Sequence, residues 1–189
     1  MNSGIIASFV IGGLLLLSIL FMNMNVSRSS SELTMRQMTQ INVSAVSEIL
    51  TYDMDKIGYD RFGKINNPIT FADSNKIVFK SNIDKMGSAE TVEWHFDSST
   101  QVASSSNIDI HPLNRSVDGD KTEINVGVSS FKLTYFDKNL NPTATLDEIR
   151  HIKVEMVISS KEQLGKIGGG GEYIRSPLEK MYSPKNLHN

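Results

Sequence analysis

The carboxylates near residue 55 are the side chains whose spacing comes closest to a metal-binding motif. Four residues have the spacing that begins a calcium-binding loop: Asp53, Asp55, Gly58 and Asp60. Such a loop also needs an oxygen ligand at its third ligand position and a glutamate at its twelfth residue. Those positions hold Ile57 and Lys64. We therefore expect solvated carboxylates at a helix end rather than a calcium site.

Two further groups could hold a cation in principle. Asp118, Gly119 and Asp120, with Glu123 nearby, form a short acidic cluster. Aspartate and glycine at these positions are also typical of a tight turn, which explains them better. The four histidines do not have the spacing of metal ligands; they are His95, His111, His151 and His188. We therefore expect no metal site, with a weak cation site near Asp118 as the open alternative.

The chain shows no pattern typical of an enzyme. No Ser-His-Asp order and no nucleophile-elbow sequence stands out. The glycine run at 168–171 lacks the Lys-Ser/Thr of a phosphate-binding loop and reads as a linker. Trp94 and the aromatic residues of 131–136 are more typical of a core than of a ligand platform. We therefore expect no catalytic residue, no cofactor and no small-molecule substrate.

Composition excludes several other classes of protein. The 189 residues carry a formal net charge of −2, which gives no electrostatic case for binding nucleic acid. The absence of cysteine excludes disulfides, a thiol nucleophile and a cysteine-based metal site. The length is enough for one anchored domain of ordinary size.

The first 22 residues contain a charge-free apolar run at 4–22. Nineteen helical residues span about 28 Å, close to the ~30 Å hydrocarbon core of a bilayer. We therefore predict a transmembrane helix over 1–27, in contact with membrane lipid. A cleaved secretory signal is the alternative, but no basic residue precedes the run and no clean cleavage pattern follows it. The expected apolar surface consists of Ile5, Ile6, Phe9, Val10, Leu14, Leu17 and Phe21.

The periodicity that follows predicts that the helix continues as an amphipathic segment over 28–58, and Gly58 supplies a stop. The whole helix would then be about 80 Å long. Two neighbouring rows of apolar residues form one wide stripe that we expect to pack on the rest of the domain. One row is Met38, Ile41, Ala45 and Ile49, and the other is Val43, Val46, Leu50, Met54 and Ile57.

After Pro68 the apolar period changes from helical to two, which predicts strands. The expected strands are 69–71, 76–80, 91–96, 108–111, 122–128, 131–136 and 149–158. An antiparallel sheet over 66–160, laid on the amphipathic half of the helix, would bury both apolar faces. We therefore predict an α+β fold. The segment 165–189 contains a glycine run and two prolines, which favours a flexible tail.

Several short motifs occur in an order that is moderately specific. An acidic segment with a glycine ends the helix at 53–59 and is followed by a strand at 94–96 and a Leu-x-Arg at 113–115. A second strand at 128–137 and an Ile-Arg-x-Ile-x-Val strand at 149–154 close the set. With the apolar helix, they resemble a type IV pilin or a type II secretion pseudopilin, closest to minor subunits of the J/W type. The chain lacks the usual basic leader and the fifth-position glutamate, since its first carboxylate is Glu32.

The resemblance implies a structural subunit of a pilus or pseudopilus-like filament, with other pilin-like subunits as partners. Apolar helices would leave the bilayer and bundle into the filament core, while the β-domains form the outer shell. It also implies a cytoplasmic N-terminus and a periplasmic or extracellular domain. The alternative is a single-pass envelope protein whose β-domain binds a partner in another secretion or adhesion apparatus.

Overall fold

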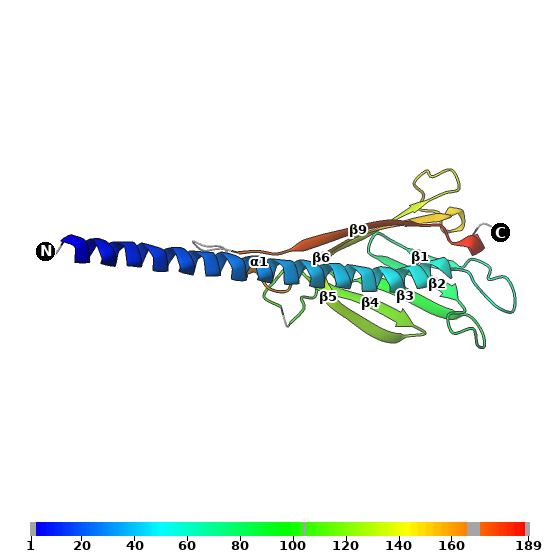
Figure 1. The fold of residues 1–189 in the computed structure, drawn as a ribbon. Coiled ribbons are helices and arrows are strands. Elements are labelled where there is room, and N and C mark those ends of the chain that lie inside the picture. Colours follow the sequence, from blue (N-terminus) through cyan, green and yellow to red (C-terminus); the bar gives the residue numbers. More distant parts are fainter. Residues whose placement is uncertain (1–2, 104, 166–170, 188–189) are drawn as a thin grey trace.

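A long helix organises the computed structural model, which describes residues 3–103, 105–165 and 171–187. Helix α1 (Ser3–Asp55) contains 53 residues without a break. Its length is therefore about 80 Å. The N-terminal half of α1 projects away from the rest of the molecule, and the C-terminal half lies along a β-sheet (Figure 1). One helix thus joins an uncovered apolar segment to a folded domain.

The sheet has seven antiparallel strands in the order β1-β2-β3-β4-β5-β6-β9. They are β1 (Ile69–Ala72), β2 (Lys76–Ser81), β3 (Glu90–Phe96), β4 (His111–Val117), β5 (Asp120–Phe136), β6 (His151–Ser159) and β9 (Arg175–Tyr182). The alternation of buried and partly exposed residues in β3 and β6 gives the sheet one apolar face. That face curls around α1, so the predicted α+β fold of a long helix packed on an antiparallel sheet is confirmed.

Strand β5 differs from the sequence prediction, which placed two strands at 122–128 and 131–136. The structure has one strand of 17 residues, whose first part pairs with β4 and whose second part pairs with β6. The change of partner occurs at Gly127, where φ is +91° and a Cβ atom would clash with the carbonyl oxygen of Ser159. Only glycine tolerates both this backbone conformation and the close approach of β6 at the point where the pairing changes.

The expected strand at 108–111 is also displaced. Strand β4 begins at His111, and residues 108–110 belong to the loop before it. That loop is held by side-chain hydrogen bonds instead of a strand ladder, including one from the backbone N–H of Asp109 to Asn107 Oδ1 at 3.0 Å. The alternating pattern that predicted a strand reflects a packed loop, in which Ile110 is buried.

The prediction of a flexible tail over 165–189 is wrong for most of that segment. A short hairpin pairs β7 (Leu164–Gly165) with β8 (Gly171–Glu172), β9 adds the last strand of the sheet, and a 3₁₀ turn (Lys185–Leu187) follows. Residues 166–170 and 188–189 lie outside the described residues. The tail orders because β9 pairs its backbone with residues 152–159 of β6, and such pairing needs few apolar side chains.

Strand β9 lies at the edge of the sheet and against α1. Ser176 donates to Thr39 Oγ1 at 3.1 Å, and Lys180 donates to Thr51 Oγ1 at 2.8 Å. Tyr182 is buried on the same side. Pro177, which has no N–H, is tolerated because it lies in an edge strand. This strand therefore fixes the helix to one margin of the sheet.

The role of β9 gives a test at two neighbouring residues. Tyr182 is 2% exposed and Met181 is 45% exposed. We expect Tyr182→Ala to lower the free energy of unfolding by about 3–5 kcal/mol, because it removes a large buried side chain. Met181→Ala, on the opposite face, should change it by less than about 0.5 kcal/mol. Denaturation of the full chain in detergent micelles, followed by the fluorescence of the sole tryptophan, Trp94, measures both. Equal and small changes in the free energy of unfolding for the two variants would support the prediction of a flexible tail.

Candidate functional site: the two halves of the long helix

The N-terminal half of α1 exposes its apolar side chains. The residues expected to form its apolar surface are between 51% (Leu17) and 78% (Phe9) exposed, and the others are Ile5, Ile6, Val10, Leu14 and Phe21. Leaving such a side chain in water forfeits roughly 1.5–3 kcal/mol relative to burial. Among the described residues, α1 is the helix long and apolar enough to cross a membrane. The exposed half is thus compatible with lipid or with other apolar helices.

The C-terminal half of α1 packs on the sheet through one row of residues. Val46, Leu50, Met54 and Ile57, with Val43, are buried in the same core cluster as the apolar face of the sheet. These residues recur every three or four positions and so share one side of the helix. Ile57 lies just beyond the helix and completes the row.

The other predicted row does not pack on the sheet, so that part of the prediction is wrong. Met38 and Ile41 are 62% and 66% exposed, and Ala45 and Ile49 are exposed as well. Consecutive helical residues point about 100° apart, so Ala45 and Val46 face different directions. The sheet covers only one of the two rows. The helix therefore keeps an apolar outer row, Met38, Ile41, Ala45 and Ile49, well beyond the apolar run at its start.

A buried ion pair joins the end of α1 to the sheet. The carboxylate of Asp53 is completely buried and accepts hydrogen bonds from Arg115 Nε at 2.6 Å and Arg115 Nη2 at 2.9 Å. Trp94 Nε1 donates to the same carboxylate at 2.8 Å. This hydrogen bonding raises the pKa of Arg115 further above its ordinary value. A bidentate contact between a guanidinium and a carboxylate is the strong form of such a pair, and the indole N–H adds a third hydrogen bond to the carboxylate.

The sequence does not predict that these three residues meet. The prediction that Asp53 is a solvated carboxylate at the helix end is wrong, because the residue is fully buried. The prediction that Trp94 belongs to the core is confirmed, since it is fully buried as well. The available signal was the position of Asp53, three residues after Leu50 and four before Ile57, within the buried row of the helix. Strand register places Trp94 opposite Arg115, and the sequence does not show that pairing.

The other candidate ligands lie in turns or far apart. Asp118 and Gly119 form the turn between β4 and β5, with φ of +49° and +91°, and Asp118 Oδ1 accepts from the backbone N–H of Thr91 on β3 at 2.7 Å. Across the part of the chain that the structure describes, no three His, Cys, Asp or Glu residues gather in a way that could hold a metal ion. His111 contacts the carbonyl of Thr100, and His151 contacts Ser183. His188 lies outside the described residues.

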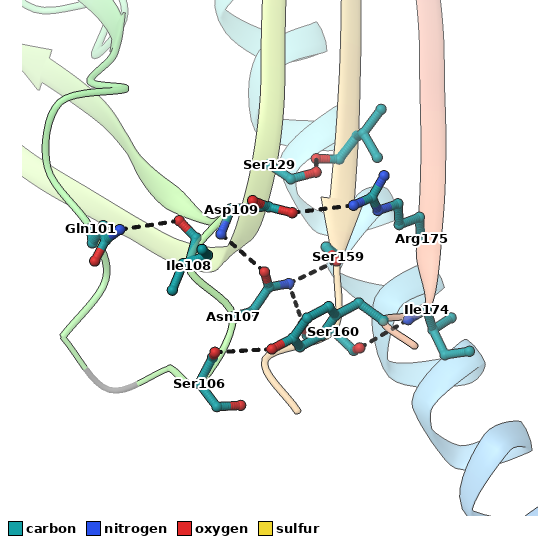
Figure 2. A network of polar contacts seen from close by, with 12 residues as sticks. Gln101, Ser106, Asn107, Ile108, Asp109, Ser129, Ser159, Ser160, Ile174 and Arg175 are labelled. Carbon is teal, nitrogen blue, oxygen red and sulfur yellow. Dashed lines mark hydrogen bonds and ion pairs between the residues drawn. The ribbon is translucent and has the colours of Figure 1, made fainter. Parts of the chain in front are cut away.

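A polar network ties the loop before β4 to the end of β6 and the start of β9 (Figure 2). Asn107 is buried, and its Nδ2 donates to Ser159 Oγ and to the carbonyl of Ser160, each at 3.0 Å. Arg175 pairs with Asp109 at 3.3 Å. The hydroxyl of Tyr173 donates to the carbonyl of Ser106 at 2.9 Å. These contacts therefore hold the segment that follows β6 against the loop that precedes β4.

Comparisons with known protein families, with curated proteins and with solved structures found no match. Three features of the structure itself therefore bear on function. They are the exposed apolar half of α1, the outer row on its other half, and the ion pair that holds the helix on the sheet. Together these features suit a protein whose helix packs against lipid or against other helices.

The ion pair gives a test with a matched control two residues away. We expect Asp53→Asn to lower the free energy of unfolding by about 3 kcal/mol, because it leaves Arg115 without its counter-charge. Asp55→Asn changes an exposed carboxylate and should cost less than about 0.5 kcal/mol. Denaturant unfolding followed by Trp94 fluorescence measures both variants in micelles. A loss of the same size in both would mean that Asp53 acts only through general charge.

Proposed function

We propose that the chain is a structural subunit of a filament of the type IV pilus or type II secretion pseudopilus kind, assembled through α1. The observation that supports this most is the outer row of Met38, Ile41, Ala45 and Ile49. Ile49 lies 27 residues beyond Met22, which is about 40 Å along the helix. A helix that serves only as an anchor needs no apolar surface that far beyond the bilayer. Neighbouring helices in a filament core would cover it.

Small residues near the start of α1 support the same proposal. Gly4, Ser8 and Gly12 are spaced four residues apart and so share one side of the helix. An added Cβ atom at Gly4 or Gly12 would have no neighbour within 4 Å. Small residues at this spacing let helices approach closely in lipid or in a helical bundle. This side would form the close contact between subunits.

The ion pair at Asp53 supports a subunit that moves as one body. Because the carboxylate, the guanidinium of Arg115 and the indole of Trp94 meet in the core, the helix has one favoured position on the sheet. Force or displacement applied to the apolar half of α1 would then reach the domain directly. Filament growth requires such rigid coupling between the packed helices and the outer domains.

A second candidate function is a single-pass envelope protein whose domain binds a partner. Phe62 and Met86 are both 71% exposed, and they belong to the loops 56–68 and 82–89. These loops lie at the end of the domain farthest from the N-terminus (Figure 1). The two loops meet where the backbone N–H of Asn82 donates to the carbonyl of Tyr59 at 2.7 Å. Exposed large apolar side chains on adjacent loops favour a contact with another protein.

Filament assembly predicts cross-links on one side of α1. The chain has no cysteine, so a single introduced cysteine reports one position. We expect Ala45→Cys to form disulfide-linked dimers of the full chain in membranes or isolated filaments. Ser44→Cys, also exposed but about 100° around the helix, should form several-fold less. Non-reducing gels measure both. Equal yields, or none at either position, would count against helix packing and favour the second candidate.

Location is tested separately. We propose that the N-terminus faces the cytoplasm and that the sheet domain lies in the periplasm or outside the cell. Protease added to spheroplasts of producing cells should then remove the domain and leave a short N-terminal fragment, which immunoblotting with an N-terminal tag detects. A cytoplasmic marker protein must stay intact as the control. Protection of the domain until the membrane is broken would reverse this topology.

A further inference from the structure

An open hollow lies between α1 and the chain that follows β6. Its volume is about 580 Å³, and it is lined by Asn23, Met24, Ser27, Arg28, Ser31, Met35, Gln163, Leu164 and Gly165. Hydroxyl, amide and guanidinium groups share this surface with two methionines and a leucine. Such a lining suits a ligand that has an anionic polar head beside an apolar part.

The depth of this hollow follows from the helix geometry. The apolar run ends at Met22, so Met24 lies about 3 Å and Arg28 about 9 Å farther along the axis. The polar layer of a bilayer is about 5–8 Å thick on each side of the hydrocarbon core. If the run spans the core, the lower end of the hollow lies among the lipid headgroups. The bilayer itself is then the nearest source of a ligand.

The charge of the hollow comes from an arginine without a counter-ion. Arg28 makes no hydrogen bond or ion pair with any described residue, whereas Arg36 pairs with Glu32 at 2.7 Å. Arg28 is partly covered, although Ser27 and Ser29 beside it are exposed, and it shares the lining of the hollow with 163–165. A partly covered guanidinium beside hydroxyl and amide groups matches the oxygens of a phosphate.

The wall opposite Arg28 is held in place by hydrogen bonds. Ser160 Oγ donates to the carbonyl of Glu162 at 2.8 Å and accepts from the backbone N–H of Ile174 at 3.0 Å. Leu164 is buried and pairs with Glu172 in the small hairpin. Asn107 Nδ2 also donates a hydrogen bond to the carbonyl of Ser160 (Figure 2). The hollow is therefore formed before any ligand enters.

We propose that this hollow binds the headgroup phosphate of an anionic phospholipid from the leaflet on the domain side. Arg28 supplies the counter-charge, and Ser27, Ser31 and Gln163 supply hydrogen-bonding groups. Met24 contacts the glycerol and upper acyl region. The bound lipid fixes the height of the domain on the membrane. The inference rests on the anchoring part of the proposed function and is independent of filament assembly.

The test uses the full chain reconstituted in phosphatidylcholine vesicles with a trace of spin-labelled lipid. Electron paramagnetic resonance measures the fraction of labelled lipid that the protein immobilises. We expect spin-labelled phosphatidylglycerol to be immobilised several-fold more than spin-labelled phosphatidylcholine. Arg28→Gln should reduce this preference to none. Arg36→Gln, about 12 Å farther along the same helix and already paired with Glu32, should leave it unchanged.

A second variant distinguishes the hollow from a bare surface charge. Gln163→Leu keeps Arg28 and removes a polar group from the opposite wall. We expect it to lower the preference for phosphatidylglycerol at least twofold. An unchanged preference in this variant or in Arg28→Gln would overturn the proposal. Loss of the preference in excess inorganic phosphate, at matched ionic strength, would also overturn it, by showing a general anion site.

Flotation of the same vesicles separates this inference from the proposed function. A chain that fails to float with the vesicles would refute membrane anchoring, and the lipid site with it. A chain that floats but shows no preference for phosphatidylglycerol would refute the lipid site alone. Flotation together with a preference that depends on Arg28 and Gln163 supports both.

Discussion

The arrangement of the domain depends on the buried carboxylate of Asp53. Burying an unpaired carboxylate costs several kcal/mol, so this helix end is stable only where donors meet it. Arg115 and Trp94, on neighbouring strands, provide those donors at a single position. A helix shifted by one residue or rotated by one position would leave the charge without partners. The ion pair therefore selects which row of α1 faces the sheet, and by exclusion which row stays outside.

The same helix serves two environments. Its first half exposes apolar side chains over a length that matches a bilayer, and its second half has one buried side and one exposed apolar side. No break separates the halves, so the domain has a fixed direction relative to the apolar segment. The polar network around Asn107 and Ser160 holds the chain after β6 close to the point where the apolar run ends. These features hold the domain close to the apolar segment rather than on a flexible stalk.

Both functional proposals concern surfaces that the fold leaves uncovered. The outer row and the small residues of α1 suit contacts with other helices, and the hollow beside Arg28 suits a lipid headgroup. They occupy different parts of the helix, so one subunit could use them in turn. A subunit that leaves the membrane would exchange lipid contacts for helix contacts, and the headgroup site would empty in the same step.

The sequence alone determined the features that arise from local periodicity. A charge-free run of 19 residues implies a helix of bilayer length, and alternation in 91–96 and 149–158 implies half-buried strands, whatever the rest of the chain does. The α+β fold follows from the order of these elements. The sequence did not reveal β9, because an edge strand held by backbone pairing along β6 needs little apolar alternation of its own.

Only the tertiary structure decided which side of α1 is covered and which carboxylate is buried. Val46 and Ala45 are both apolar helical neighbours, and the sequence cannot rank them. The curl of the sheet determines how much of the helix is covered, and it belongs to the whole set of paired strands. The meeting of Asp53 with Arg115 and Trp94 joins residues 41 and 62 positions apart. Such contacts depend on strand register and on the curvature of the sheet, which are properties of the assembled fold and not of any local segment.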